Sequence, residues 1–376
     1  MDFKLNEEQE MLKNSARDFL KKKVNKDVIK DLSESETGFD KKLWKAMVNL
    51  DWPAIIIPEN YNGIGWSLLE LTVLFEEFGR AAFNGPMLAN LSGTMILMEG
   101  GSEEQKSDLL PAVAAGEKIL TLATNEPNVA YDMTQIELKA EKQGNNFVLN
   151  GRKILVPYAE IADILIVAAR SSGSPGDHEG ISLFLVDRKT VGITYSSMPV
   201  IGEEKVYQLD FDGVKIPASK IVGKAGQAIP VLDAALEKTT VIQCAEMVGN
   251  AQQELEMTSN YARDRVQFGR PIATFQSVQH RLSDMYVDVQ GARWTTYQAA
   301  WRLSEKMPAA RETAITKIIC NRTVQNVAFS AQQLHGGMGV DLDYDLHWYY
   351  TRAKALELKH GSSPAQLEKL QAEMGL

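Results

Sequence analysis

The hydrophobic pattern of this chain changes its period twice, and this limits the folds that are open to it. From residue 1 to about 118, apolar residues recur at helical spacing, as in LNEEQEMLKNSARDFLKKKV. From about 119 to 225 they alternate or run together in short stretches such as DILIVAAR and ISLFLVDR, which is typical of strands. Long helical patterns return from 226 to 376. The sequence therefore predicts an N-terminal α-helical domain (1–118), a β-barrel or sandwich domain (119–225) and a C-terminal α-helical domain (226–376).

Local capping and turn signals support this pattern. Asn6 stands just before two glutamates, and Ser102 is followed three positions later by Gln105. Both arrangements predict the N-terminus of a helix. The run GNN at 144–146 predicts the tip of a β-hairpin.

The composition argues against several classes of protein. Hydrophobic residues make up 44% and charged residues 24% of the 376 positions, which is ordinary for a globular chain of more than one domain. The formal net charge of -9 argues against a nucleic-acid-binding surface. No apolar run reaches about 18 residues, so no membrane-spanning helix is expected. The N-terminus is charged from its first residues, unlike a signal peptide, and a cytoplasmic location is expected.

The cysteine and histidine residues offer no metal site. Cys244 and Cys320 lie in helical apolar-periodic stretches, which favours buried thiols in a reducing compartment over a disulfide. The five histidines include no pair at i, i+3 or i, i+4 spacing. No metal cofactor is expected.

One segment, RVQFGRPIATFQSVQHRLSDM at 265–285, places an arginine, an aromatic residue and two glutamines around a Gly–Pro break in a helical pattern. The guanidinium of Arg265 is a planar fork of donors, which suits two phosphate oxygens at once. This run resembles the Arg-x-x-Phe-Gly segment of the acyl-CoA dehydrogenase family of flavoproteins. The resemblance implies that Arg265, Phe268 and Gln276 contact the pyrophosphate and adenosine of an FAD bound mainly to a neighbouring subunit.

The resemblance covers nearly the whole chain, from MDFKLNEEQEML at the start through LLPAVAAGEKILTLATNEP and DFDGVKIPASKIVG. Near the C-terminus, QLHGGMGV resembles the run that meets the adenine end of FAD, and this assigns that role to Gln333, Gly336 and Gly337. Glycine suits the position because backbone approaches a phosphate or ribose closely only where no Cβ intrudes. The resemblance implies a fold that is mainly α with a central β-barrel: an α-helical domain, the barrel and a C-terminal four-helix bundle.

The chain departs from the family where the catalytic base is expected. In the family, a carboxylate removes the α proton of an acyl-CoA thioester while the β hydrogen leaves as hydride to the flavin. Most members carry this base in a Tyr-Glu-Gly-Thr turn, and the matching stretch here is KHGS, with His360 in place of the glutamate. Other members place it on the first helix of the C-terminal domain, where this chain has Thr239. Glu237 is two residues away, which turns it roughly 200° around the helix.

Substitutions also fall where relatives contact the flavin ring. Tyr131 stands where a serine usually meets the flavin phosphate, and LVP at 155–157 replaces the Trp-Ile-Thr that lies along the ring. Pro157 offers neither a hydroxyl nor an N–H. Pro364 occupies another position that is usually able to touch flavin. The half of the FAD site that is lent to a neighbour is kept, whereas the half built within one subunit is altered.

Two functions therefore remain open, and a third is less favoured by the sequence. In the first, the chain is one subunit of a hetero-oligomeric acyl-CoA dehydrogenase and lends FAD-binding residues to a paralogous catalytic subunit. In the second, it is a self-standing FAD-dependent acyl-CoA dehydrogenase with His360 as the base, since imidazole has a suitable unperturbed pKa. The third is another flavin chemistry on the same fold, such as oxygenation or desulfination. Acyl-CoA is the expected substrate, and an electron-transferring flavoprotein is the family's usual electron acceptor. The chain is expected to form a homo- or hetero-oligomer through its C-terminal helices, whose apolar residues lie on more than one face.

Overall fold

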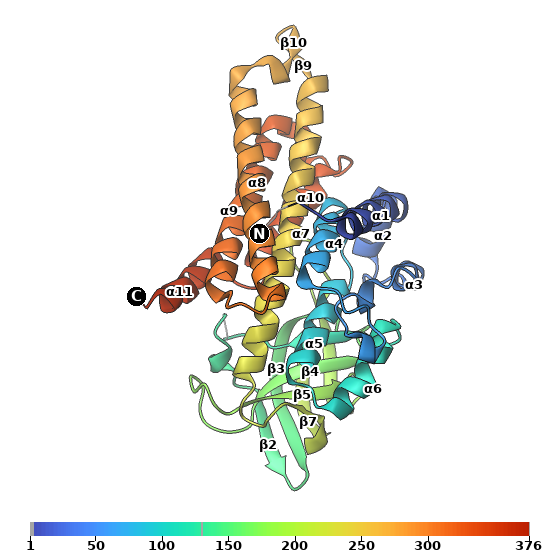
Figure 1. Cartoon of the computed structure of the whole chain (residues 1–376), viewed down its shortest axis with the longest axis vertical. Coiled ribbons are helices and arrows are strands. Elements are labelled where there is room, and N and C mark those ends of the chain that lie inside the picture. The colour runs from blue at the N-terminus through green and yellow to red at the C-terminus, as the bar shows by residue number, and fades with distance from the viewer. Residues whose placement is uncertain (1–3, 129–130, 376) are drawn as a thin grey trace.

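The computed structural model describes residues 4–128 and 131–375, and it begins with a layer of helices (Figure 1). Asn6 caps the first helix by accepting the backbone N–H of Gln9 at 2.8 Å, and Ser102 accepts that of Gln105 at 3.2 Å. Both predicted helix starts are confirmed. The helices of this layer are α1 (Glu7–Lys23), α2 (Lys26–Glu34), α3 (Lys41–Val48), η1 (Trp52–Ala54), η2 (Glu59–Tyr61), α4 (Leu68–Arg80), α5 (Met87–Gly100) and α6 (Glu103–Ala114).

The middle of the chain forms one mixed sheet at the lower end of the molecule (Figure 1). The strand order is β6-β7-β3-β2-β4-β5-β8, and β1 pairs in parallel with β4. Gly144, with φ 60°, turns the chain between β2 and β3, which confirms the predicted hairpin. The strands are β1 (Leu120–Ala123), β2 (Lys139–Gln143), β3 (Asn146–Pro157), β4 (Ile164–Arg170), β5 (Ile181–Asp187), β6 (Ile193–Met198), β7 (Val206–Pro217) and β8 (Ile221–Val222), with short helices η3 (Met133–Gln135) and η4 (Ala218–Lys220).

The expected β-barrel needs correction, because this sheet is open. Within the described residues its path has two ends, β6 and β8, and these do not pair with each other. The pairing is thin at two places. β2 meets β4 only at Lys139 and Arg170, and β8 is two residues long. A barrel requires continuous pairing around its circumference, so the supported description is a middle β domain between two helical ones.

The C-terminal part is helical and rises from one side of the sheet (Figure 1). Helices α7, α8 and α9 pack against one another, α10 packs against α7 and α9, and α11 packs against α9. Their apolar core includes Cys244 and Cys320, which are buried free thiols, as predicted. The elements are α7 (Ile229–Asp264), β9 (Val266–Gln267), β10 (Arg270–Pro271), η5 (Ile272–Thr274), α8 (Gln276–Ser304), α9 (Ala310–His335), η6 (Gly336–Val340), α10 (Leu346–Leu358) and α11 (Ser363–Met374).

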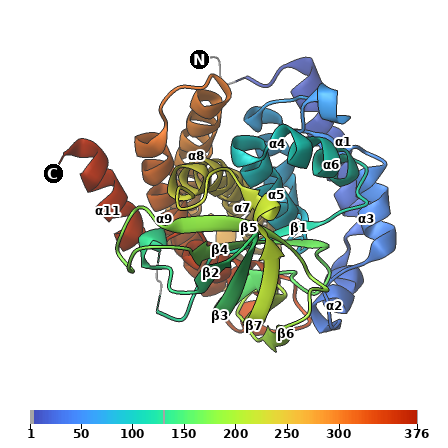
Figure 2. The ribbon, with the colours of Figure 1, turned by 90° about the horizontal axis from the view of Figure 1, so that it is seen from below.

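The two helical domains meet where α4 crosses α7, near the centre of the molecule as seen from below (Figure 2). Gly79 of α4 and Gly249 of α7 allow this crossing. A Cβ on Gly79 would lie 1.9 Å from the carbonyl oxygen of Glu246, and one on Gly249 would lie 1.8 Å from that of Glu76. The two helix backbones are therefore in direct contact.

None of the helices in the described ranges is long and apolar enough to cross a membrane.

Candidate functional site

The segment predicted to meet FAD forms the tip of the C-terminal helices, at the far end from the sheet (Figure 1). Arg265 ends α7, and β9 and β10 form a hairpin whose two-residue turn is Phe268 and Gly269, with φ 54° and 78°. Two positive φ values are typical of a type I′ turn, whose twist matches that of the strands. The turn leaves the Phe268 ring 92% exposed, and α8 starts with the exposed side chain of Gln276.

The second predicted run lies where α9 ends. Gln333 is exposed in its last turn, and Gly336 ends the helix with φ 58° and ψ −133°. Only glycine adopts that conformation readily. A Cβ on Gly336 or Gly337 would meet nothing within 4 Å, so this backbone is open to a ligand or a partner.

An aromatic stack brings the two runs together. The ring of Tyr261, one turn before Arg265, stacks on His335 with centroids 4.3 Å apart, and His335 directly precedes Gly336. The other face of the arrangement is closed by Tyr344, whose hydroxyl lies 3.1 Å from His335 Nε2. All six predicted FAD-contact residues therefore lie on one end of the C-terminal helices.

His360 is not part of this group. It follows α10 in a left-handed conformation, φ 57°, and its turn lies beside Lys317, near the start of α9. Lys317 and Gln333 are separated by about 24 Å along that helix. Within one chain, the predicted base position and the predicted FAD-contact residues are thus at opposite ends of the C-terminal helices. This separation is compatible with contacts to FAD molecules in two different subunits.

The surroundings of His360 are positively charged. Its side chain is half-buried, and loss of hydration, followed by the charges of Lys359, Lys317 and Lys369, lowers its pKa well below the usual value. Lys359 is paired with Glu204, whose Oε1 lies 2.6 Å from the ammonium nitrogen. The imidazole is therefore held in its neutral form.

The second position used for a base in relatives carries no acid either. Thr239 is fully buried, and its hydroxyl donates to the carbonyl oxygen of Ala235 at 3.1 Å. Glu237 is half-buried, and burial raises its pKa. The carboxylate lies near Thr313 at the start of α9 and Glu373 near the end of α11.

Tyr131 and Pro157, two of the residues at positions expected to contact the flavin, make hydrogen bonds within the chain. The hydroxyl of Tyr131 donates to the carbonyl oxygen of Leu358 at 2.8 Å, in the last turn of α10. The carbonyl oxygen of Pro157 accepts the hydroxyl of Thr121 at 2.6 Å. The hydroxyl of Tyr131 is thus used within the chain and Pro157 has no N–H to offer a ligand, whereas the exposed tip and the open glycines leave room for one.

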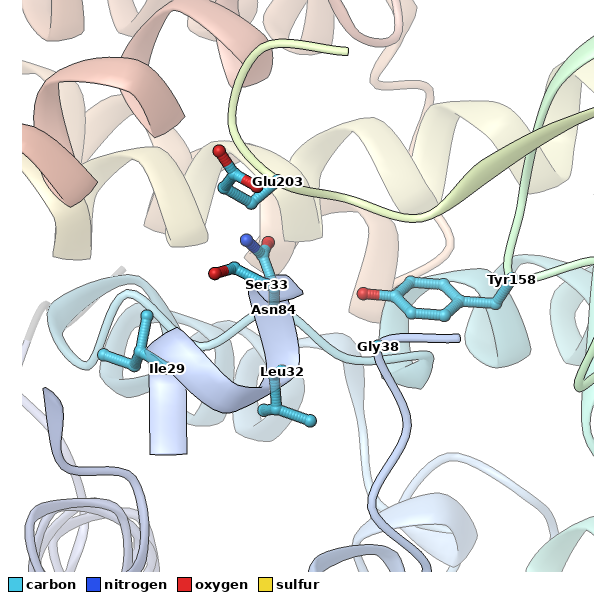
Figure 3. A pocket seen from close by; sticks show the side chains of 7 residues that line it. All are labelled: Ile29, Leu32, Ser33, Gly38, Asn84, Tyr158 and Glu203. Carbon is cyan, nitrogen blue, oxygen red and sulfur yellow. The ribbon is translucent and has the colours of Figure 1, made fainter. Parts of the chain in front are cut away.

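Directly after Pro157 the interior is nearly filled. Tyr158 is buried with φ 52°, and its ring points into a cavity of only about 10 Å³ (Figure 3). That volume holds about one water molecule. The cavity is lined by Ile29, Leu32, Ser33, Gly38, Asn84, Tyr158 and Glu203.

Sequence reasoning missed a set of buried polar residues around the His360 turn. Gln243, Lys317, Asn321 and Gln366 come from α7, α9 and α11 and donate to backbone oxygens of the turn or of the end of α10. A lysine in the apolar stretch TAITKIIC was the one available signal. Across residues 4–128 and 131–375, no three His, Cys, Asp or Glu side chains gather in a way that could hold a metal ion.

Comparison with known proteins identifies the family to which this sequence and fold are similar. The N-terminal, middle and C-terminal domain models of acyl-CoA dehydrogenase match residues 6–117, 121–214 and 228–375. The acyl-CoA dehydrogenase FadE27 of Mycobacterium tuberculosis is 30% identical over 92% of this chain and 91% of its own length.

Two solved structures extend the match to the whole chain. Butyryl-CoA dehydrogenase from Megasphaera elsdenii superimposes with a TM-score of 0.92 at 27% identity, over 100% of both chains. A chain of the ChsE4-ChsE5 complex from Mycobacterium tuberculosis superimposes with a TM-score of 0.90 at 29% identity, over 100% of this chain and 99% of that one. The chain therefore belongs to the acyl-CoA dehydrogenase family, whose cofactor is FAD, and is an FAD-dependent oxidoreductase of that family or a subunit of one.

Proposed function

We propose that this chain is one subunit of a hetero-oligomeric acyl-CoA dehydrogenase that acts on an acyl-CoA thioester. It lends its tip to FAD seated in a paralogous catalytic subunit, through Arg265, Phe268, Gln276, Gln333, Gly336 and Gly337. When bound there, FAD would supply the hydride acceptor for the β hydrogen of the substrate. The α proton goes to a carboxylate of the partner subunit.

The observation that carries this proposal is the environment of His360. A general base must accept a proton in the transition state, and it works best when its pKa lies near the operating pH. Burial removes hydration from the protonated form of His360, and protonation would add a cation beside Lys359 and Lys317, so its pKa lies well below the usual value. The residue that replaces the usual glutamate is therefore a poor proton acceptor, and Thr239 supplies no alternative.

The surface of the C-terminal helices supports assembly with another subunit. A groove of about 600 Å³ lies between α7 and α8 and includes the apolar side chains of Leu255, Leu282, Tyr286 and Val287. Tyr286 and Val287 are exposed, as is Phe329 on α9. Exposed apolar surface of this kind is typical of subunit interfaces. The similar ChsE4-ChsE5 structure is itself a complex of two differently named chains.

The flavin content of the chain tests the proposal directly. Expressed alone, the chain is expected to purify with much less than one FAD per subunit, because only the outer half of the site is fit for FAD. Co-expression with a paralogous chain that retains the glutamate should give a stable complex that retains FAD through gel filtration. A full complement of FAD in the isolated chain would instead favour the self-standing enzyme with His360 as the base.

Arg265 is expected to contribute to FAD retention in that complex. Loss of one charge-assisted bidentate contact typically costs about 1.5–3 kcal/mol, or roughly a tenfold to hundredfold drop in affinity. Arg265→Ala should therefore release FAD on dilution, as measured by flavin fluorescence, with helix content unchanged in circular dichroism. The matched control is Arg311→Ala, an exposed arginine in the first turn of α9. Equal FAD retention in both variants would remove Arg265 from the site.

Two further assignments remain predictions for the assembled enzyme. An electron-transferring flavoprotein as acceptor can be tested by reduction of that protein on addition of acyl-CoA. A cytoplasmic location suits the free buried thiols of Cys244 and Cys320 and can be tested by cell fractionation.

A further inference from the structure

The turn that carries His360 is fixed by buried amide side chains from three helices. Gln366 of α11 donates to the carbonyl oxygen of His360 at 2.8 Å, and Asn321 of α9 donates to the next carbonyl oxygen along the chain at 3.3 Å. Gln243 of α7 donates to the carbonyl oxygen of Leu356, in the last turn of α10, at 3.2 Å. The turn is thus held through its backbone, so its shape does not depend on the imidazole.

Lys317 is the charged member of this group, and its side chain is 0% exposed. Its ammonium donates to the carbonyl oxygens of Leu356 at 2.8 Å and Glu357 at 3.3 Å, and to Asn321 Oδ1 at 2.7 Å. A lysine ammonium has three donors, which these three oxygens can satisfy, and the sulfur of Met247 also lies 3.6 Å from the nitrogen. The last carbonyls of a helix lack intrahelical partners and carry partial negative charge, so a cation there is favourable. This explains how a lysine is tolerated in an apolar core.

Of the lysines near His360, Lys317 is the one that is fully buried. Lys359 belongs to the turn itself and pairs with Glu204 at 2.6 Å. Lys369 reaches His360 from α11, and Glu357, at the end of α10, pairs with Lys354 at 2.6 Å. Both pairs are partly exposed and are screened by solvent. The buried ammonium of Lys317 is screened much less.

We propose that Lys317 is a positioning residue of the His360 turn: its buried ammonium ties the end of α10 to α9 and places a fixed positive charge beside the turn. The turn is therefore held in one place, whether or not His360 takes part in chemistry. This inference goes beyond the assignment of the chain as a partner subunit, because it concerns the folded chain without FAD or substrate.

A change of pH removes the charge of Lys317 without changing that of His360. Burial lowers the pKa of Lys317 itself to about 8, against the opposing effect of the nearby Cys244, Cys320 and Glu357 side chains, so its charge is present at neutral pH and is lost as the pH rises through that value. His360 is neutral over the same range. Amide exchange in residues 359–362, which follow α10, should accordingly become faster above pH 8 relative to the amides within α10, while the imidazole signal does not change.

Histidine NMR on the full-length chain tests the proposal. Of the five histidines, His360 is assigned by the signal that disappears in His360→Gln. In Lys317→Met, the titration midpoint of His360 should move up, and hydrogen exchange of the 359–362 amides should become faster. The matched control is Lys369→Met, which removes a cation near His360 that has no hydrogen bond to the turn among the described contacts. It should leave the exchange unchanged.

A second variant distinguishes the effect of the Lys317 charge from the effect of its hydrogen bonds. It also keeps the proposal testable when the first variant does not fold. Lys317→Gln keeps a hydrogen-bond donor but loses the charge, so it should raise the His360 midpoint while largely preserving the slow exchange. An unchanged midpoint in either folded Lys317 variant would overturn the electrostatic part. Unchanged exchange in Lys317→Met would overturn the tether. Neither readout uses flavin or activity, so failure here is distinguishable from failure of the subunit assignment.

Discussion

Without its partner, the chain is expected to dehydrogenate acyl-CoA about 10²–10⁴-fold more slowly than the assembled enzyme, even when FAD is supplied in excess. General-base catalysis is commonly worth that factor, and neither position used for the base in relatives carries a carboxylate. His360 replaces one and the buried hydroxyl of Thr239 the other. The measurement is bleaching of flavin absorbance after mixing with a series of acyl-CoA thioesters.

Restoring the carboxylate alone should not restore the rate. His360→Glu would place an acid in the turn, but Pro157 would still offer no N–H to a flavin ring, and Tyr131 would still bind the end of α10. We therefore expect His360→Glu to remain within about tenfold of the unmodified isolated chain, since a misplaced base gains little. The comparison variant is His360→Ala. Rapid bleaching by the unmodified isolated chain, abolished in His360→Ala, would sink the partner-subunit assignment and make His360 the base.

The largest effect on folding is expected at the crossing of α4 and α7. In Gly249→Ala, the added methyl group would lie 1.8 Å from the carbonyl oxygen of Glu76, and backbone atoms cannot rotate away as a side chain can. The helices must separate, which breaks packing along both. We expect a loss of about 3 kcal/mol, the upper end of the usual range for overpacking, and a melting temperature lowered by roughly 4 °C when the 376 residues unfold together. Differential scanning calorimetry measures both, and Gly79→Ala should behave alike.

The control for this prediction is the same substitution at Gly291 of α8. A Cβ there would meet nothing within 4 Å, and the residue is exposed in a helix. Because alanine is the better helix former, Gly291→Ala should be neutral or stabilising by up to about 1 kcal/mol. A normal melting temperature for Gly249→Ala would mean that the two helices are less tightly apposed than the structure shows.

The sequence predicted those parts of the fold that depend on neighbours along the chain. Capping by Asn6 and Ser102 and the hairpin at Gly144 follow from local hydrogen bonding and local backbone conformation. Closure of the sheet was not predictable in this way, because it depends on pairing between β6 and β8, which are separated in sequence and carry no mutual signal. The domain boundaries at 118 and 225 stay a prediction.

The candidate site shows the same division. Arg265, Phe268 and Gln276 lie within one short segment, so their common location at the tip followed from the motif. The hydrogen bonds of Lys317 to the end of α10 join residues about forty positions apart and follow from no periodicity. Likewise the sequence showed that Tyr131 replaces a serine, but not that its hydroxyl would bind Leu358. The roles of the tip residues and of His360 stay predictions.

The length of helix α7 determines where the tip residues lie relative to the sheet. It is an unbroken helix of 36 residues, about 54 Å long, that runs from the sheet to the tip (Figure 1). Its contact with α4 at two glycines removes any freedom to slide. The length of this helix thus fixes the distance between Arg265 and the middle β domain. One inserted residue would advance the tip by about 1.5 Å and rotate it by about 100°. An insertion within α7 would therefore displace the tip residues, whereas an insertion in a loop would leave the distance between the tip and the sheet unchanged.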